Sequence, residues 1–477
     1  MPSTKFVCTL GPATQEREQI LALARAGMDV ARLNFSHGTH EWHAERFRLL
    51  RDMEGELGRP LSVLQDLTGP KLRIGDLPPE GVRISPGDAC VFSLEPYQAG
   101  PPPRFPLPIP PLLAALQPGQ HVYLDDGILD LLIVERRGEE VRCEVQHGGV
   151  LRGRKGISAP SVPFDIPSLT EKDFRDLDLG LQLGMDWIAV SFVRRPEDLH
   201  PVREAARRAG VDTQIIAKIE QPEAVEAIDP ILDACDGLMV ARGDLGVEMP
   251  LVQVPIIQKD LIRRCLRQGK PVITATQMLE SMTASPRPTR AEVSDVANAI
   301  LDGTSAVMLS AETAIGSFPV QSVAIMAAIA EFTEAHLDSG YPRSGWGLLH
   351  ETLSDRSVSI TDAISQGVCE IANDLKVAAI LCVTTSGQTA RMISRLRPRM
   401  PIIGATASER TYHRLPLLWG VRPLLVPPSA STDEELAAAV QGAVNAGWVK
   451  PGATVVITLG APVGMPGQTN LAKVQMV

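Results

Sequence analysis

Residues 214–241 read QIIAKIEQPEAVEAIDPILDACDGLMVA and contain the pattern that decides the fold. Two short apolar runs, Gln214–Ile219 and Gly237–Ala241, flank a segment with helical periodicity, Pro222–Ala234. Neither run alternates strictly between apolar and polar residues, which is typical of strands in a parallel sheet that is covered on both faces. The stretch therefore predicts a β–α–β unit of an α/β fold.

The same alternation of strand and helix recurs on both sides of this stretch. The strand-like runs are Lys5–Thr9, Met28–Leu33, Leu61–Gln65, Trp187–Phe192, Gln214–Ile219, Gly237–Ala241, Pro271–Ala275 and Ser305–Leu309. The helical segments are Glu16–Ala26, Thr39–Leu57, Glu171–Leu183, Pro196–Ala209, Pro222–Ala234, Val254–Gln268 and Thr289–Leu301. Eight such strands predict a closed (β/α)8 TIM barrel, although a doubly wound open sheet also alternates in this way.

The interval between the third and fourth strands breaks this rhythm. Short strand-like pieces separated by Gly and Pro predict a small all-β insertion, residues 71–163, and the proline-rich stretch Pro96–Pro118 predicts an extended loop within it. An insertion after the third strand lies over the carboxyl end of the barrel, where active sites are built, so we expect a lid. The barrel domain then comprises residues 1–70 and 164–340.

A second α/β domain is predicted after the barrel, at residues 341–477, and an irregular stretch, Leu337–Arg356, resembles a linker. The strand-like runs of this domain are Ala378–Val383, Ile402–Ala405, Val421–Val426 and Thr454–Leu459. With helical segments between them, these runs predict a small open sheet.

Composition excludes several classes of protein. With 46 basic and 56 acidic residues the net charge is −10, which argues against a nucleic-acid-binding protein. No apolar run approaches the length of a membrane helix, and the N-terminus lacks the apolar core of a signal peptide. Seven cysteines without a C-x-x-C pair predict reduced thiols. We expect a cytoplasmic protein that does not associate with membranes.

The polar residues that follow the strands indicate the chemistry. Lys218 and Glu220 share one face of their strand because successive side chains alternate, and Gly243 and Asp244 follow the next strand. Two carboxylates that share a metal with substrate oxygens are typical of Mg²⁺. A plain salt bridge between Lys218 and Glu220 is the structural alternative.

Further strand ends contribute hydroxyl and basic groups. Thr276, Ser310 and Glu312 could bind a carboxylate or relay a proton, although each could equally be a helix cap. The second and third strand ends contribute Arg32, Asn34, Ser36, His37, Asp66, Lys71 and Arg73. Three basic groups suit a nucleotide phosphate chain, but no Walker A loop and no G-x-G-x-x-G follows a strand. The spacing of His37, His40 and His43 could suggest a metal site, but surface histidines are the better interpretation.

Together these segments resemble the pyruvate kinase family along nearly the whole chain. The motifs that carry the resemblance are ARLNFSHGTH (31–40), IAKIE (216–220), MVARGDLG (239–246), ATQMLESM (275–282), RPTRAE (287–292), DVAN (295–298) and MLSAET (308–313). The resemblance implies a barrel domain, an inserted β-barrel lid and a C-terminal regulatory domain. It also implies that phosphoenolpyruvate and ADP react to give pyruvate and ATP.

By the same resemblance, roles fall on particular residues. Lys218 would stabilise the transferred phosphoryl group, and Glu220 and Asp244 would bind Mg²⁺ or Mn²⁺. The substrate carboxylate would be held by Gly243, Asp244 and Thr276, and water-mediated protonation of the enolate would involve Thr276, Ser310 and Glu312. The resemblance also assigns phosphoryl or nucleotide contacts, namely to Arg32, Asn34, Phe35, Ser36, His37, Arg73 and Lys155.

One departure from the family pattern concerns K⁺. Many relatives read Asp-Thr-Lys-Gly-Pro-Glu-Ile-Arg-Thr where this chain reads Asp66-Leu-Thr-Gly-Pro-Lys71-Leu-Arg73-Ile, so Lys71 replaces the glutamate associated with K⁺ dependence. A tethered ammonium there could supply the charge of K⁺ in a pocket formed by Asn34, Ser36, Asp66, Leu67 and Lys71. We therefore expect an enzyme that needs a divalent metal but not K⁺, unless Lys71 is merely a solvated lid residue.

The resemblance further implies an effector site and a homotetramer. The effector loop would be Thr384, Thr385, Ser386, Gly387, Gln388 and Thr389, before a helix. The late loop Gly460–Asn470 has no Arg, Lys or Trp, which favours a monophosphorylated sugar or AMP over a bisphosphate; a capped helix without any effector is the alternative.

Two other functions stay open at this point. A barrel lyase that handles phosphoenolpyruvate or pyruvate could share the metal carboxylates, but it would not need the nucleotide residues or the lid. A catalytically inactive regulatory relative would be expected to have lost Lys218, Glu220 or Asp244, and all three are present.

Overall fold

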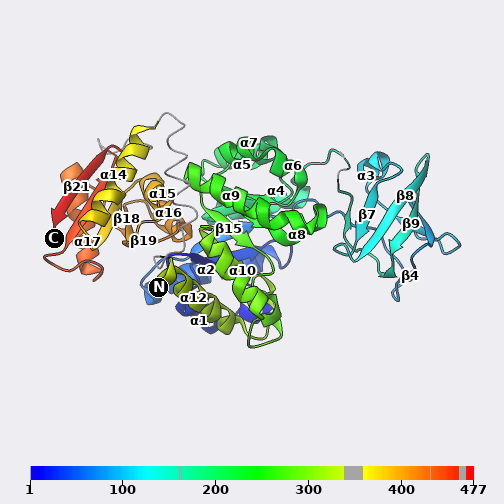
Figure 1. Ribbon diagram of the computed structural model, residues 1–477, viewed down its shortest axis with the longest axis horizontal. Helices are drawn as coiled ribbons and strands as arrows, with labels where there is room; N and C mark the ends of the chain where they lie inside the picture. The colour runs from blue at the N-terminus through cyan, green and yellow to red at the C-terminus, as the bar shows by residue number, and fades with distance from the viewer. Residues whose placement is uncertain (1, 161, 163, 338–357, 430, 461–468) are drawn as a thin grey trace.

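A computed structural model of the chain describes residues 2–160, 162, 164–337, 358–429, 431–460 and 469–477. The expected linker, Leu337–Arg356, lies almost entirely outside these residues. The chain forms three bodies in a row, with the barrel in the middle, the insertion at one end and the C-terminal domain at the other (Figure 1). No helix in the described part of the chain is long and apolar enough to cross a membrane.

The barrel predicted from the alternation is confirmed. Its eight parallel strands close in the order β1-β16-β15-β14-β13-β12-β3-β2. Their bounds are β1 Lys5–Thr9, β2 Val30–Asn34, β3 Ser62–Asp66, β12 Trp187–Val190, β13 Gln214–Ile219, β14 Gly237–Ala241, β15 Val272–Ala275 and β16 Ala306–Leu309. Closure of the ladder between β1 and β16 excludes the open doubly wound sheet.

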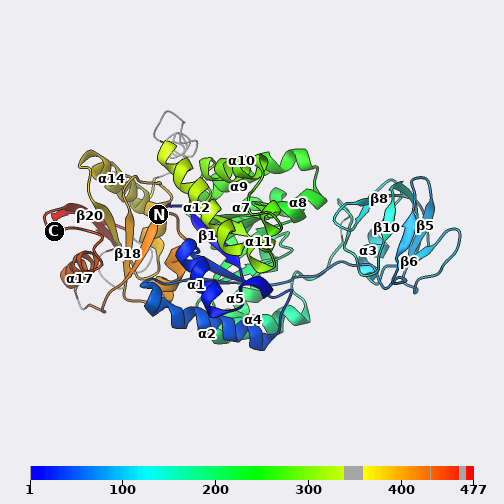
Figure 2. The ribbon, with the colours of Figure 1, turned by 90° about the horizontal axis from the view of Figure 1, so that it is seen from below.

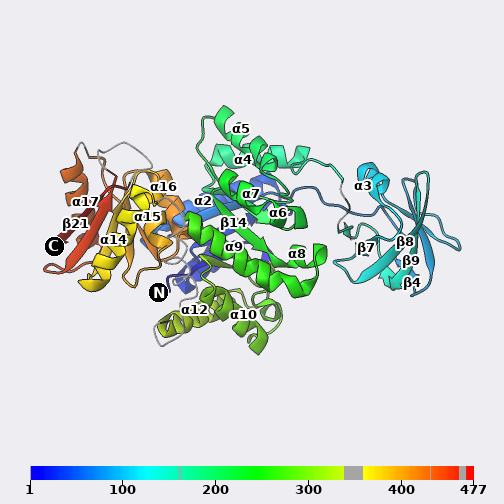
Figure 3. The same cartoon turned by 45° about the horizontal axis from the view of Figure 1, so that its top comes forward.

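Helices surround the strands, as Figure 3 shows. They are α1 Arg17–Ala26, α2 His40–Leu57, α4 Glu171–Leu183, α5 His200–Arg208, α6 Pro222–Glu226, α7 Ile228–Ala234, α9 Val254–Gln268, α10 Arg290–Leu301 and α12 Pro319–His336, with short α8 Arg242–Glu248 and α11 Ala311–Ala314 directly after two strands. The single helix expected at Pro222–Ala234 is wrong: it divides at Ala227 into α6 and α7. Pro230 explains the break, because proline lacks an N–H and its ring clashes with the carbonyl four residues earlier.

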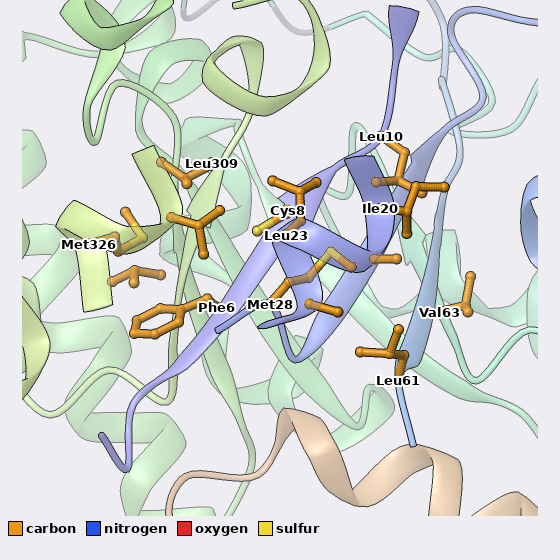
Figure 4. Packing of buried hydrophobic residues seen from close by; sticks show 14 of the residues in the cluster. Phe6, Cys8, Leu10, Ile20, Leu23, Met28, Leu61, Val63, Leu309 and Met326 are labelled. Atoms are coloured by element: carbon orange, nitrogen blue, oxygen red, sulfur yellow. The ribbon is translucent and has the colours of Figure 1, made fainter. Parts of the chain in front are cut away.

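The strands are buried on both faces, which is why their sequences do not alternate. On the outside of β1, Phe6 and Cys8 pack against residues of α1 such as Ile20 and Leu23, and Met326 of α12 completes this layer (Figure 4). Side chains from other strand positions fill a separate layer inside the barrel. They are Val7, Val30, Leu64, Trp187, Ala189, Ile216, Met239, Ile273, Ala275, Ala306 and Met308. The barrel interior is therefore a packed core and not a channel.

The insertion after β3 is all-β apart from one short helix. A six-stranded sheet has the order β11-β7-β8-β9-β5-β6, and β4 pairs with β10 in a separate ribbon. The bounds are β4 Val82–Ile84, β5 Ala89–Ser93, β6 Arg104–Pro106, β7 His121–Leu124, β8 Leu129–Arg137, β9 Glu140–His147, β10 Gly149–Leu151, β11 Ile157–Ser158 and helix α3 Pro110–Ala115. The ladder of these described strands does not close into one barrel, and two extended connections join the insertion to the barrel (Figure 2).

The extended loop expected at Pro96–Pro118 is also wrong. This stretch contains strand β6 and helix α3, which begins with Pro110 and Pro111. Proline is tolerated in the first turn of a helix because its missing N–H has no intrahelical partner there. Leu112 and Leu113 of α3 are buried in the core of the insertion, and that burial stabilises the helix.

The C-terminal domain is the open sheet that the sequence predicted. Its five strands have the order β19-β18-β17-β20-β21, and β21 is the antiparallel member. The bounds are β17 Ala379–Val383, β18 Ile402–Thr406, β19 Val421–Leu425, β20 Thr454–Leu459, β21 Leu471–Met476, α14 Ile360–Asp374, α15 Gln388–Ser394, α16 Glu409–Arg414 and α17 Thr432–Asn445. Leu417 of this domain is buried within the cluster that fills the barrel, so the domain packs on the end opposite to the insertion.

Candidate active site

A cavity of about 360 Å³ lies where the carboxyl ends of the barrel strands face the insertion. The insertion contributes Tyr123, Asp126 and Ser158 to its lining, and the barrel contributes most of the rest. Ten residues that the sequence singled out line this cavity together, namely Arg32, Asn34, Ser36, His37, Asp66, Leu67, Lys71, Lys218, Glu220 and Asp244. The insertion therefore covers the predicted site, as a lid would.

Lys218, on β13, is the central cation of the cavity. Its Nζ lies 2.8 Å from Glu220 Oε1 and 3.3 Å from Asp66 Oδ1, and it donates to Ser191 Oγ at 2.6 Å. Burial alone would lower the pKa of Lys218, but Asp66, Glu220 and Asp244 together outweigh burial and raise the pKa above its ordinary value. The side chain is therefore a permanent positive charge at neutral pH.

Glu220 and Asp244 are the two carboxylates with the chemistry of Mg²⁺ ligands. Glu220 is buried, and its Oε2 accepts a hydrogen bond from the backbone N–H of Phe192 at 2.9 Å. Burial raises the pKa of Glu220, Lys218 opposes that effect and Asp244 adds to it. No cluster of three His, Cys, Asp or Glu side chains capable of holding a metal occurs in the described residues. Two hard carboxylates that leave the other positions to substrate and water fit Mg²⁺ or Mn²⁺.

Arg32, in the middle of β2, lines the cavity and is held by two side chains. Its Nε donates to Asp66 Oδ2 at 2.7 Å and its Nη1 donates to Thr9 Oγ1 at 2.8 Å. Burial raises the pKa of Asp66, but Lys218 and Arg32 together leave it below its ordinary value. Asp66 therefore stays ionised between two cations and fixes both of them.

Thr276 follows β15 in a strained conformation. Its φ is +65°, which is rare for a β-branched residue and is typical of functional sites. Its Oγ1 accepts from the N–H of Gly243 at 2.8 Å and donates to the carbonyl of Ala275 at 2.7 Å. The structure thus brings Gly243 and Thr276 together beside Asp244, although neither lines the cavity itself.

Ser310 and Glu312 lie further from the cavity. Both oxygens of the buried Glu312 are engaged: Oε1 accepts from Leu279 N at 3.0 Å and Oε2 accepts from Ser310 N at 2.7 Å. Ser310 Oγ is buried, and no hydrogen-bond partner for it occurs in the described part of the chain. Glu312 therefore joins the ends of two strands, and a part in proton transfer stays a prediction.

The loops after β2 and β3 carry the residues that the sequence predicted for a monovalent-cation pocket. Ser36 Oγ lies 3.3 Å from Thr68 Oγ1, and the N–H of Ser36 donates to Asn34 Oδ1 at 3.0 Å. Burial lowers the pKa of Lys71, and the cations Arg73, Lys172 and Lys218 lower it further. Burial also lowers the pKa of His37, and the nearby cation Lys71 lowers it further.

Three predicted nucleotide residues lie away from the cavity lining. Phe35 belongs to the barrel core and stacks on His43, with their ring centroids 3.8 Å apart. Arg73 donates to the carbonyl of Arg154 at 2.6 Å, and Lys155 pairs with Asp125 at 2.8 Å within the lid. The structure therefore does not bring Phe35, Arg73 and Lys155 into the cavity.

The histidines His40 and His43 each bond to a different protein group. His43 Nε2 lies 2.9 Å from the carbonyl of His37, and His40 Nε2 lies 2.7 Å from Asp176 Oδ1. Burial lowers the pKa of His43 to about 4, so this ring is neutral. Lys172 Nζ, which the sequence analysis did not single out, contacts both Asp176 Oδ2 and the carbonyl of Phe35 at 2.6 Å.

Sequence reasoning missed several lining residues. Ser191 and Phe192 directly follow β12, so the rule that active sites form at strand ends would have found them. Tyr123 and Asp126 come from a distant strand and turn of the lid, and no local signal marks them. The approach of the lid to the barrel is a tertiary property.

In the C-terminal domain the hydroxyls of Thr384 and Thr389, in the expected effector loop, bond to protein groups. Gly387 has φ +85° and its N–H donates to Thr384 Oγ1 at 2.9 Å, while Thr389 Oγ1 lies 3.0 Å from Thr469 Oγ1. Most of the late loop, residues 461–468, lies outside the described residues.

A barrel with a lid over a buried lysine, an arginine and paired carboxylates has the groups that phosphotransferases use. The family model "Pyruvate kinase, barrel domain" matches residues 1–323, and "Pyruvate kinase, alpha/beta domain" matches residues 362–475. The chain belongs to the pyruvate kinase family.

Curated relatives agree with this assignment. Pyruvate kinase of Geobacillus stearothermophilus is 46% identical over 99% of this chain and 80% of its own length. Pyruvate kinase of Bacillus licheniformis is 44% identical over 100% of this chain and 81% of its own length. Pyruvate kinase of Clostridium acetobutylicum is 40% identical over the full length of both chains.

Proposed function

We propose that this chain transfers the phosphoryl group of phosphoenolpyruvate to ADP, giving pyruvate and ATP, with Mg²⁺ or Mn²⁺ and without K⁺. The observation that carries the proposal is the cavity beneath the lid, where Lys218 lies between Asp66 and Glu220. Family membership supports a kinase over a barrel lyase or an inactive relative, and the complete set of Lys218, Glu220 and Asp244 agrees with that choice.

The chain's own residues divide the work of phosphoryl transfer. Lys218 and Arg32 attract the oxygens of the transferred group, whose charge is spread outward in the transition state. Glu220 and Asp244 would hold the divalent ion, which supplies positive charge to substrate and phosphoryl oxygens when bound. The Gly243–Thr276 pair would orient the substrate carboxylate, and Thr276 would deliver a proton to the enolate through water.

Independence from K⁺ is the part of the proposal that depends on Lys71. Lys71 lines the cavity together with Ser36 and His37, and its ammonium would supply there the positive charge that a bound K⁺ otherwise provides. Pyruvate formation should be measured with phosphoenolpyruvate, ADP and Mg²⁺, with tetramethylammonium replacing K⁺ at constant ionic strength. Full turnover without K⁺ is expected; strong activation by K⁺ at saturating ADP would refute the role of Lys71.

An effector pocket for a monophosphorylated sugar or AMP is proposed at Thr384–Thr389. The turn at Gly387, which comes directly before helix α15, supports it. Titration with ribose 5-phosphate and AMP should lower the half-saturating concentration of phosphoenolpyruvate. An unchanged value with both compounds would favour a capped helix without an effector.

Assembly into a homotetramer is proposed as well. Leu251 and Val252, in the turn before α9, and Ile256, in its first turn, are exposed, and Met476 on the edge strand β21 is exposed too. Exposed apolar side chains close together in the chain indicate an interaction surface. Analytical ultracentrifugation should give four times the 51.4 kDa of one chain. We also propose a cytoplasmic location, because all seven cysteines are free and buried.

A further inference from the structure

Arg194 joins the lid to the barrel at the rim of the active site. It lies just after β12, and its side chain is 12% exposed. Its Nη1 donates to the carbonyl of Phe164 at 3.1 Å, and its Nη2 donates to the carbonyl of Ile166 at 2.5 Å. Both carbonyls belong to the connection by which the chain returns from the lid to the barrel. One guanidinium therefore fixes two points of that connection.

The same guanidinium also covers Phe192. Its Cζ lies 5.2 Å from the centroid of the Phe192 ring, a distance typical of a cation–π contact. Phe192 has φ +59°, a left-handed conformation that costs a bulky residue about 1–3 kcal/mol. Surrounding contacts must hold Phe192 in this conformation, and the Arg194 side chain supplies one of them.

The strained backbone of Phe192 directs its N–H toward the active site. This N–H donates to Glu220 Oε2 at 2.9 Å, while Glu220 Oε1 contacts Lys218. A change in the Phe192 backbone would therefore rotate or release the Glu220 carboxylate. Glu220 itself is buried, so its orientation depends on these contacts and not on solvent.

Arg194 is anchored independently of the lid. Its backbone N–H donates to Asp198 Oδ2 at 2.8 Å, and Asp198 is buried in the turn that follows β12. The neighbouring Arg195 shares the same charged partners, Asp198 and Asp165, but its side chain is 54% exposed. No contact of Arg195 with Phe192 or with the carbonyls of Phe164 and Ile166 occurs among the described residues.

We infer that Arg194 is a positioning residue that couples the return connection of the lid to Glu220 through the strained backbone of Phe192. The inference rests on the proposed metal-binding role of Glu220. It deepens that role: the position of the lid sets the affinity for the divalent ion, and binding of the ion in turn favours the lid position that Arg194 holds. Such coupling is reciprocal by linkage.

The test measures metal binding without turnover. Mn²⁺ should be titrated into the full-length protein, with free Mn²⁺ followed by electron paramagnetic resonance, for wild type, Arg194→Met and Arg195→Met. Residues that orient a metal ligand typically change metal affinity by about 10–100-fold. We expect R194M to raise the Kd for Mn²⁺ about tenfold and R195M to change it less than twofold. Arg194→Lys, which keeps the charge but cannot bridge both carbonyls, should fall between them.

The outcomes separate this inference from the proposed function. If wild type binds no Mn²⁺, the proposed metal site itself is wrong. If wild type binds Mn²⁺ and R194M binds it equally well, the coupling through Arg194 is refuted. A double-mutant cycle of R194K with Phe192→Ala tests the route without the larger R194M change. We expect the two changes in Kd to be non-additive; additive changes would overturn the route through Phe192.

Discussion

We expect the replacement of Lys218 by Met to have two separate effects, one on turnover and one on stability. The first is a loss of turnover, because the variant lacks the cation that attracts the phosphoryl oxygens. Removal of a single group that stabilises transition-state charge typically lowers kcat by about 10²–10³-fold. We expect at least that loss for Lys218→Met in steady-state pyruvate formation, with the wild-type fold retained by circular dichroism.

The second effect is a pH-dependent loss of stability. Removing one partner of a buried ion pair costs about 3–5 kcal/mol because the other charge is left buried. Asp66 keeps its contact with Arg32 at 2.7 Å, so the carboxylate that is left without its cation is Glu220. Burial raises the pKa of Glu220, and in the wild type Lys218 opposes that rise. In the variant this pKa rises further above the value in the unfolded chain. The penalty is therefore full above the folded-state pKa and declines as pH falls through that pKa, because the native protein then binds the proton.

Calorimetric melting of the barrel at pH 5 and pH 8 measures this effect. The difference in Tm between wild type and K218M should be larger at pH 8 than at pH 5. Arg195→Met, which removes an exposed cation, serves as the control and should show no such pH dependence. An equal difference in Tm at both pH values would refute the reasoning about Glu220.

Three further predictions follow from single residues. Lys71→Glu should convert the enzyme into one that K⁺ activates, measured as kcat in K⁺ and in tetramethylammonium. Gly180→Ala should destabilise the barrel by about 1–3 kcal/mol and lower its Tm, because the added Cβ would lie 1.9 Å from Gln65 Oε1. The control is Gly55→Ala, whose Cβ would meet nothing within 4 Å and should not lower Tm. Burial raises the pKa of Glu248 to about 7, so wild type should lose stability relative to Glu248→Gln as pH rises from 6 to 8; parallel Tm curves would contradict this.

The barrel could be predicted from the sequence because strands that are buried on both faces are apolar throughout and do not alternate with polar residues. Runs such as Gln214–Ile219 lack alternation since helices cover one face and the barrel core the other. Strand ends then placed Lys218, Glu220 and Asp244 correctly in one cavity. Errors arose where a local rule was overridden: Pro230 divided a helix, and burial of Leu112 made a helix in a proline-rich stretch.

Other parts of the site depend on geometry that no local pattern encodes. The left-handed conformations of Phe192 and Thr276 occur in residues that normally avoid them, so propensity predicts the opposite. Tyr123 reaches the cavity only because the lid folds back over the barrel. The burial of Phe35 against His43 shows the converse error, since a residue inside a family motif can serve the core.

Leu417 makes the packing of the barrel depend on the C-terminal domain. One end of the barrel is closed by Leu417 of the C-terminal domain, which packs in the same buried apolar cluster as Trp187. A fragment that ended at residue 337 would lack Leu417, and the apolar residues that Leu417 covers would be exposed to water. The C-terminal domain therefore completes the packed core of the barrel, so the stability of the barrel depends on a domain that follows it in the chain.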